Sequence, residues 1–153
     1  MNQEFLKQTV LFQELTEEEL VDVLVIGHVE NFKAKDVVFK EGDPGDTLYL
    51  IIEGSIRISK FIDKNEEALA VLEPQSYFGE MTILDSEPRS AWAIAHTDAT
   101  LFSIESKKLL ELFEKNSTIG YKFLWAFAIT LTKRLRMTND KFNIMMSIAN
   151  LGF

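Results

Sequence analysis

One short segment in the middle of the chain, FGEMTILDSEPRSA at 78–91, gathers groups that can bind a phosphate ester. Gly79 stands where the backbone must turn sharply, and the residues after it predict one helical turn whose free amide groups favour an anion. Arg89 can donate paired hydrogen bonds to two phosphate oxygens, and Ser90 offers a hydroxyl beside it. The segment therefore predicts a phosphate-binding site.

Strand patterns surround this segment and must position it. The strands that we expect cover 37–39, 47–53, 55–59, 68–72, 92–95 and 100–104, with a hairpin tip at Lys64-Asn65. Clusters of glycine, proline, aspartate and asparagine separate them, most densely at 41–46. Short strands at this spacing favour an antiparallel sandwich or jelly roll. The fold class is therefore mainly β with flanking α: an antiparallel β-roll with N-terminal helices and a long C-terminal helix.

The chain begins with two helical patterns. Apolar residues recur at helical spacing in 3–12, which predicts a first short helix. A second helix is expected to begin at Thr16 and to end near Gly27. Thr16 and Glu19 have the spacing of a capping box, in which each side chain accepts a hydrogen bond from the other residue's backbone.

The end of the chain is helical. We expect one helix over 105–114 and a second that Ser117 caps and that runs to Ala149, about 50 Å at 1.5 Å per residue. So long a helix cannot bury itself against a small β-roll, so it needs a partner. A heptad seam, which predicts a homodimer, runs through Leu131, Leu135, Thr138, Phe142, Met145 and Ala149.

The bulk composition limits the possible functions. The chain has 153 residues, a net charge of −8 and no cysteine, which favours a single domain over 1–153 without disulfides. An acidic surface repels nucleic acid, and the one dense basic cluster, at 133–136, is short, so we expect no direct DNA binding. No signal peptide or stretch of about 18 apolar residues is evident, so we expect a cytoplasmic protein away from membranes.

The segment 78–91 resembles the phosphate-binding cassette of the cyclic-nucleotide-binding domain family. The glycine-punctuated stretch 41–54 looks like the family's strand pair, and the last two helices match its B and C helices. The resemblance covers nearly the whole chain. It implies N-terminal helices over 1–27, a β-roll over 28–104 and the B and C helices over 105–153.

The resemblance also implies residue roles. Glu80 would accept a hydrogen bond from the ribose 2′-hydroxyl, and Arg89 would pair with the cyclic phosphate. Gly79 would let the backbone approach the sugar, while Ser90 and the amide of Ala91 would donate to phosphate oxygens. The ligand-binding set implied in the cassette is Gly79, Glu80, Met81, Arg89, Ser90 and Ala91.

The stretch 133–141 resembles the C-helix of bacterial catabolite-activator-type regulators. Thr138 would then contact the base in its own subunit and Asn139 the base across the dimer, and both can hydrogen-bond adenine N6. Cyclic AMP is the ligand we expect, with cyclic GMP possible because the hydroxyl of Ser90 can also contact guanine. Because the sequence stops at Phe153, we expect the chain to sense a ligand without the helix-turn-helix of those regulators.

Simpler interpretations stand beside these. Glu80 and Arg89 could be an ordinary surface ion pair, and Thr138 could only set the register of a coiled coil. Arg134 could reach the phosphate, but we expect it on a solvated helix face. Trp92 and Trp125 are expected in the core or an interface.

Enzymatic and metal chemistry is not indicated by the sequence. The two histidines, His28 and His96, lie far apart with no carboxylate motif, so we expect no metal site. No catalytic triad or carboxylate pair is evident, so we expect no enzyme. The sequence predicts a regulatory sensor with a downstream protein partner that it does not name. A ligand-free interaction module and the sensor part of a transcription regulator remain as alternatives.

Overall fold

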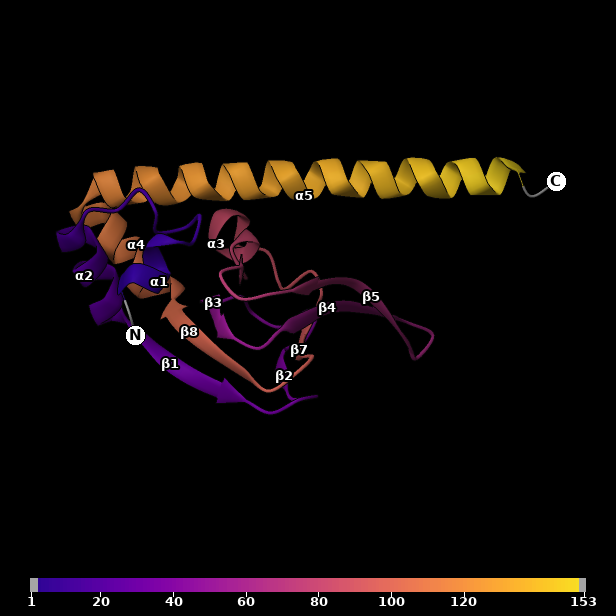
Figure 1. Ribbon diagram of the computed structural model, residues 1–153, viewed down its shortest axis with the longest axis horizontal. Coiled ribbons are helices and arrows are strands. Elements are labelled where there is room, and N and C mark those ends of the chain that lie inside the picture. Colours follow the sequence, from indigo (N-terminus) through magenta and orange to yellow (C-terminus); the bar gives the residue numbers. More distant parts are fainter. Residues whose placement is uncertain (1–2, 152–153) are drawn as a thin grey trace.

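Two antiparallel sheets form a β-roll in the computed structural model, which describes residues 3–151 (Figure 1). The first sheet has the order β1 (Gly27–Phe32), β8 (Ala99–Glu105), β3 (Thr47–Glu53), β6 (Tyr77–Phe78). The second has the order β2 (Val37–Phe39), β7 (Trp92–Ala95), β4 (Ile56–Ile62), β5 (Asn65–Leu72). The jelly-roll prediction is confirmed.

The β4–β5 hairpin is longer than the sequence indicated. It turns at Asp63 and Lys64, which both have positive φ, one residue before the expected tip. β5 begins at Asn65, whereas the sequence predicted a start at residue 68. The sequence did not indicate the first residues of the strand because they are polar and exposed and carry no apolar alternation.

The N-terminal helices gather at one end of the roll with α4 (Ser106–Lys115), as Figure 1 shows. α2 (Glu17–Ile26) has the predicted capping box, with Thr16 and Glu19 bonded reciprocally. The first helix is shorter than predicted: α1 spans Gln3–Lys7, and the chain then continues in turns. The hydroxyl of Thr9 donates to the carbonyl of Leu6 there. Of the apolar residues that suggested a longer helix, Leu11 is buried in these turns and Val10 is half-buried.

The core has two parts, which the alternation of the strands separates. Leu48 and Leu50 of β3 point to one side, where they pack with the N-terminal helices, α4 and the first half of α5. Ile51 and Leu101 belong to a second cluster inside the roll. The first sheet is therefore covered by helices on its outer face.

α5 (Ser117–Leu151) lies along the whole molecule and passes over α3 (Met81–Asp85) (Figure 1). Its 35 residues make it about 52 Å long. Asn116, not Ser117, caps it, because the Asn116 side chain accepts hydrogen bonds from two amides of the first turn. No helix among residues 3–151 is long and apolar enough to cross a membrane.

Candidate ligand-binding site

The cassette follows β6 and turns at Gly79. Gly79 has a φ of +88°, a left-handed conformation that favours glycine. A Cβ at this position would lie 2.7 Å from Nη1 of Arg89 and 2.8 Å from the carbonyl oxygen of Thr47. Glycine is therefore required both by the backbone and by the guanidinium that packs against it.

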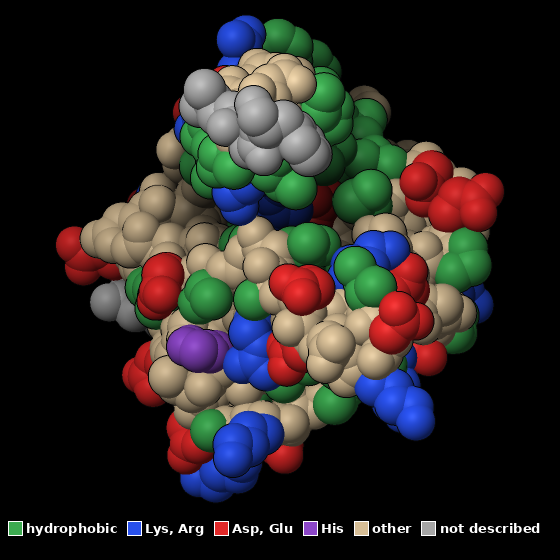
Figure 2. Space-filling view, turned by 90° about the vertical axis from the view of Figure 1, so that its right-hand side faces the viewer, with side chains coloured by type: hydrophobic (Ala, Val, Ile, Leu, Met, Phe, Trp, Pro, Cys, Tyr) green, Lys and Arg blue, Asp and Glu red, His purple; other side chains and the backbone are tan. Residues whose placement is uncertain are grey.

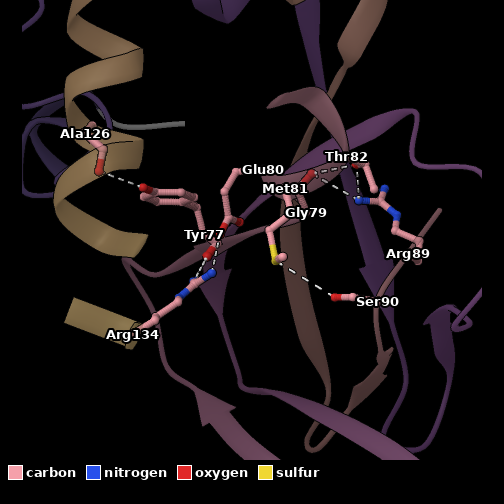
Figure 3. Close-up of polar contacts among 9 residues, drawn as sticks. All are labelled: Tyr77, Gly79, Glu80, Met81, Thr82, Arg89, Ser90, Ala126 and Arg134. Atoms are coloured by element: carbon pink, nitrogen blue, oxygen red, sulfur yellow. Dashed lines mark hydrogen bonds and ion pairs between the residues drawn. The ribbon is translucent and has the colours of Figure 1, made fainter. Parts of the chain in front are cut away.

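Arg89 is buried, with only 4% of it exposed, and protein groups contact its guanidinium from several sides. Its Nη1 donates to the Gly79 carbonyl at 3.1 Å and to Oγ1 of Thr82 at 3.2 Å (Figure 3). Its Nη2 donates to the Thr47 carbonyl at 2.7 Å. The guanidinium carbon lies 4.1 Å from the centre of the Phe39 ring, as in a cation–π contact. Nε has no hydrogen-bond partner.

The turn at 41–46 fixes the backbone of Arg89. The Arg89 amide donates to the carbonyl of Asp43 at 2.9 Å, and the amide of Gly42 donates to the carbonyl of Arg89 at 2.8 Å. Burial lowers the pKa of the guanidinium, although arginine keeps its charge at neutral pH. A buried cation with an unpaired donor is therefore built into the cassette.

Glu80 is the acidic counterpart of Arg89, with only 1% exposed. Its Oε1 lies 2.5 Å from Nη1 of Arg134 on α5, while Oε2 has no partner. Nη2 of Arg134 also donates to the Tyr77 carbonyl at 2.7 Å (Figure 3). Burial raises the pKa of the Glu80 carboxyl because it outweighs the attraction of Arg134.

These contacts correct two expectations. Glu80 does not pair with Arg89 on the surface, since its ion-pair partner is Arg134 and both members of the expected pair are buried. Arg134 does not stand on a purely solvated face, because it spans from α5 to the cassette.

Tyr77 is a second link between the cassette and α5. Its hydroxyl donates to the carbonyl of Ala126 at 3.0 Å, and its ring lies 5.7 Å from that of Phe127. Burial raises the pKa of Tyr77 to about 12. The strand that leads into the cassette is therefore anchored to α5 at Ala126 and again at Arg134, about two turns further along the helix.

Residues 29–116 match the family model of the cyclic nucleotide-binding domain. The chain belongs to the cyclic nucleotide-binding domain family. The match covers the whole cassette, α4 and the β-roll except for the first two residues of β1.

Two sequence relatives and one solved structure illustrate the family. The chain is 33% identical, over 72% of its length and 48% of the relative's, to a CRP-like cAMP-activated global transcriptional regulator of Mycobacterium tuberculosis. It is 37% identical, over 72% of its length and 12% of the relative's, to a cGMP-dependent protein kinase of Plasmodium berghei. A cyclic nucleotide-binding domain from Methylobacillus flagellatus aligns with a TM-score of 0.80 at 27% identity, over 90% of this chain and 78% of that one. The chain thus spans at most about half the length of these two sequence relatives.

The cyclic nucleotide-binding domain brings together the six residues that the sequence placed in the cassette. Glu80 and Arg89 are buried, and Gly79 is half-buried beside them. Ser90 is exposed, with its hydroxyl 3.9 Å from the sulfur of Met81, and Ala91 is buried directly before β7.

Thr138 and Asn139 lie apart from the cassette, one helical turn beyond Arg134. Both are exposed, and the Thr138 hydroxyl donates to the carbonyl of Arg134. Half a turn further, Lys141 donates to the carbonyl of Leu69 on β5 at 3.1 Å. The base-contacting roles of Thr138 and Asn139 remain predictions.

Three residues of the domain's site were not identified from the sequence. Thr82 and Phe39 contact the Arg89 guanidinium, and Tyr77 anchors the cassette. Their positions depend on contacts between distant segments. Of the three, only Thr82 could have been identified from the sequence, because it is a hydroxyl residue in the short apolar turn of the cassette.

Proposed function

We propose that this domain binds cyclic AMP reversibly and acts as a regulatory sensor. The proposal rests on one observation: two buried polar atoms of the cassette, Oε2 of Glu80 and Nε of Arg89, have no partner in the described structure. A buried polar group without a hydrogen bond costs about 1–3 kcal/mol, so such atoms point to a ligand that supplies the missing bonds. One atom is an acceptor and the other a donor.

A cyclic nucleotide offers the complementary groups. Its ribose 2′-hydroxyl can donate to Glu80, and its phosphate oxygens can accept from Arg89. Three of the five N–H donors of Arg89 are used by protein acceptors, which leaves Nε–H and one hydrogen of Nη2. Two donors on one guanidinium suit a phosphate with two free oxygens.

Helix geometry supports the two base contacts. Successive residues are about 100° apart around a helix, so Thr138 lies about 40° from Arg134, and Asn139 about 140° from it. Since Arg134 faces the cassette of its own chain, Thr138 is on the side of that site, while Asn139 points away from it. This placement fits a base held by Thr138 of one chain and Asn139 of a second chain.

A homodimer through α5 completes the proposal. Upstream of Leu131, the predicted heptad seam includes three more positions, Ala128, Leu124 and Tyr121. Its apolar members are exposed over the free half of the helix, with Phe142 at 61%. Figure 2, which looks along α5 from its C-terminal end, shows hydrophobic side chains around that end. A second copy of the chain would cover them.

The same helix would transmit the signal. Arg134 now occupies one oxygen of Glu80, and the ribose hydroxyl would approach the other. A ligand bound between the cassette and α5 contacts both, so it binds best to one docked position of the helix and shifts the population toward it. A downstream partner would then recognise the resulting dimer. The ligand is bound and released unchanged, as in a sensor rather than an enzyme.

The relatives support a cyclic purine nucleotide but differ in the base. One is named as cAMP-activated and another as cGMP-dependent. Adenine is favoured here by Thr138 and Asn139, and the exposed hydroxyl of Ser90 keeps cyclic GMP as the second candidate.

Calorimetric titration with cyclic AMP, cyclic GMP and cyclic dinucleotides tests the proposal. We expect cyclic AMP to bind most tightly, and Arg89→Lys to weaken it roughly 10- to 100-fold, because one paired, charge-assisted contact is lost. The matched control is Arg57→Lys, which changes an arginine of β4 that is paired with Glu66 of β5 and should leave affinity unchanged. Equal affinities for Arg89→Lys and wild type would refute the site. Absence of binding by every nucleotide would favour the ligand-free interaction module.

A further inference from the structure

Thr82, in the first turn of α3, has a hydroxyl with two defined contacts. Its Oγ1 donates to the carbonyl of Gly79 at 3.1 Å and accepts from Nη1 of Arg89 at 3.2 Å (Figure 3). Because its one proton is directed to Gly79, its lone pairs are free to receive the guanidinium. The residue is 7% exposed, so water does not compete freely for these bonds.

The chain makes room for this side chain at a distant position. A Cβ built on Gly45 would lie 2.1 Å from Cβ of Thr82 and 2.2 Å from its Oγ1. The φ of Gly45 is outside the left-handed region, so space rather than backbone conformation requires glycine there. Gly45 and Thr82 therefore fit together as a pair.

The other contacts of the guanidinium act on different sides of it. The carbonyl of Thr47 accepts from Nη2, and the ring of Phe39 lies against the flat face. Thr82 is the side-chain acceptor on Nη1, so it opposes rotation of the group about its long axis. Such a rotation would turn the free Nε–H away from its place at the cassette.

We propose that Thr82 is a positioning residue for phosphate binding: its hydroxyl, seated against Gly45, orients the Arg89 guanidinium so that Nε–H faces the phosphate. The inference rests on the proposed function, since it assigns the orientation of the arginine that would bind the ligand. In this proposal Thr82 acts through Arg89 and makes no contact with the ligand itself.

The first experiment needs no ligand. Hydrogen exchange of the Arg89 Nε–H is followed by NMR in ¹⁵N-arginine-labelled protein, with the signal assigned by its loss in Arg89→Lys. We expect Thr82→Val to speed this exchange about fivefold or more, because one hydrogen bond of the guanidinium is lost. Thr82→Ser keeps the hydroxyl and should stay close to wild type. Equal exchange in Thr82→Val and wild type would overturn the proposal.

The second experiment asks whether the orientation matters for phosphate. Cyclic AMP should bind roughly tenfold more weakly to Thr82→Val, about 1.4 kcal/mol, and nearly normally to Thr82→Ser. The two phosphorothioate diastereomers of cyclic AMP, each with sulfur in place of one free oxygen, report on the alignment of Arg89. We expect Thr82→Val to reduce the preference of the wild type for one of them. A merely structural role would weaken both equally, and that result contradicts the proposal.

Failure of the proposed function and failure of the positioning role of Thr82 give different results. If the wild type binds no cyclic nucleotide, the proposed function fails, while the exchange rates of the free protein still decide whether Thr82 holds Arg89. If the wild type binds and Thr82→Val binds equally well, the positioning role fails and the function stands.

Discussion

The substitution Glu80→Gln removes a negative charge from a carboxylate that is almost completely buried and only half paired. Oε1 has Arg134 at 2.5 Å, and Oε2 has no partner. Glutamine keeps the shape and one acceptor oxygen. The substitution therefore separates what the charge contributes to ligand binding from what it costs the fold.

Two opposite effects follow from the structure. A hydrogen bond from a ribose hydroxyl to a carboxylate is stronger than one to an amide, and losing a charge-assisted bond costs about 1.5–3 kcal/mol. Cyclic AMP should therefore bind about 10- to 100-fold more weakly to Glu80→Gln. The free protein should be as stable as wild type at neutral pH, or more stable, because burial penalises the charge.

The raised pKa of Glu80 determines whether its contribution to stability grows or falls with pH. Since the pKa of Glu80 is raised above its ordinary value of 4.5, the folded state binds more protons than the unfolded state just above pH 4.5. The free energy of unfolding that Glu80 contributes is therefore fully present below that pH and is lost as pH rises through the folded pKa. Glutamine has no such slope, so the stability of Glu80→Gln relative to wild type should increase over this range.

Thermal unfolding of both proteins from pH 4 to 8 measures this difference, and calorimetry measures the affinity. Glu66→Gln is a control of opposite sign, because the hydrogen bond from Arg57 lowers the pKa of Glu66. Stability from Glu66 is present above the unfolded pKa and is lost on acidification. The reasoning about Glu80 is refuted if Glu80→Gln loses stability relative to wild type as pH rises, or if it binds cyclic AMP normally.

Four other variants give further tests. Gly79→Ala should lower the free energy of unfolding by about 1–3 kcal/mol in chemical denaturation, since it strains a left-handed backbone and meets Arg89. Arg134→Gln should lower the melting temperature more at pH 7 than at pH 4.5, because it leaves the charged Glu80 unpaired. Phe142→Glu should shift sedimentation toward the monomer, whereas Lys133→Glu, outside the seam, should not. Truncation after Arg136 should weaken cyclic AMP roughly tenfold by calorimetry if the distal helix holds the base; unchanged affinity would exclude that role.

Local patterns predicted most of the β-roll. β3 and β7 have the expected bounds because their apolar runs end at strong turn signals. The cap of α5 was misplaced by one residue, since Asn116 and Ser117 are both good caps and only the path of the chain decides between them. The β-roll was therefore predictable where sequence signals were local and unambiguous.

Contacts between distant segments set the rest of the site. The partner of Glu80 lies on α5, fifty-four positions along the chain, and its choice depends on how that helix docks through Tyr77. Similarly, nothing near Gly45 in the sequence indicates that the glycine accommodates Thr82. The cassette could be located from its own residues, but not the groups that orient it.

The free half of α5 also gives the domain a mechanical property. Arg134 is the last residue that ties the helix to the cassette, and beyond it the exposed Lys141 donates a single hydrogen bond to the Leu69 carbonyl of β5. From Arg134, sixteen residues lead to Asn150, a lever of about 24 Å at 1.5 Å per residue. A tilt of about 10° at Arg134 would therefore move the far end by about 4 Å. A displacement of that size is large enough to rearrange an interface, although the hydrogen bonds that change at the pivot shift by only a fraction of it.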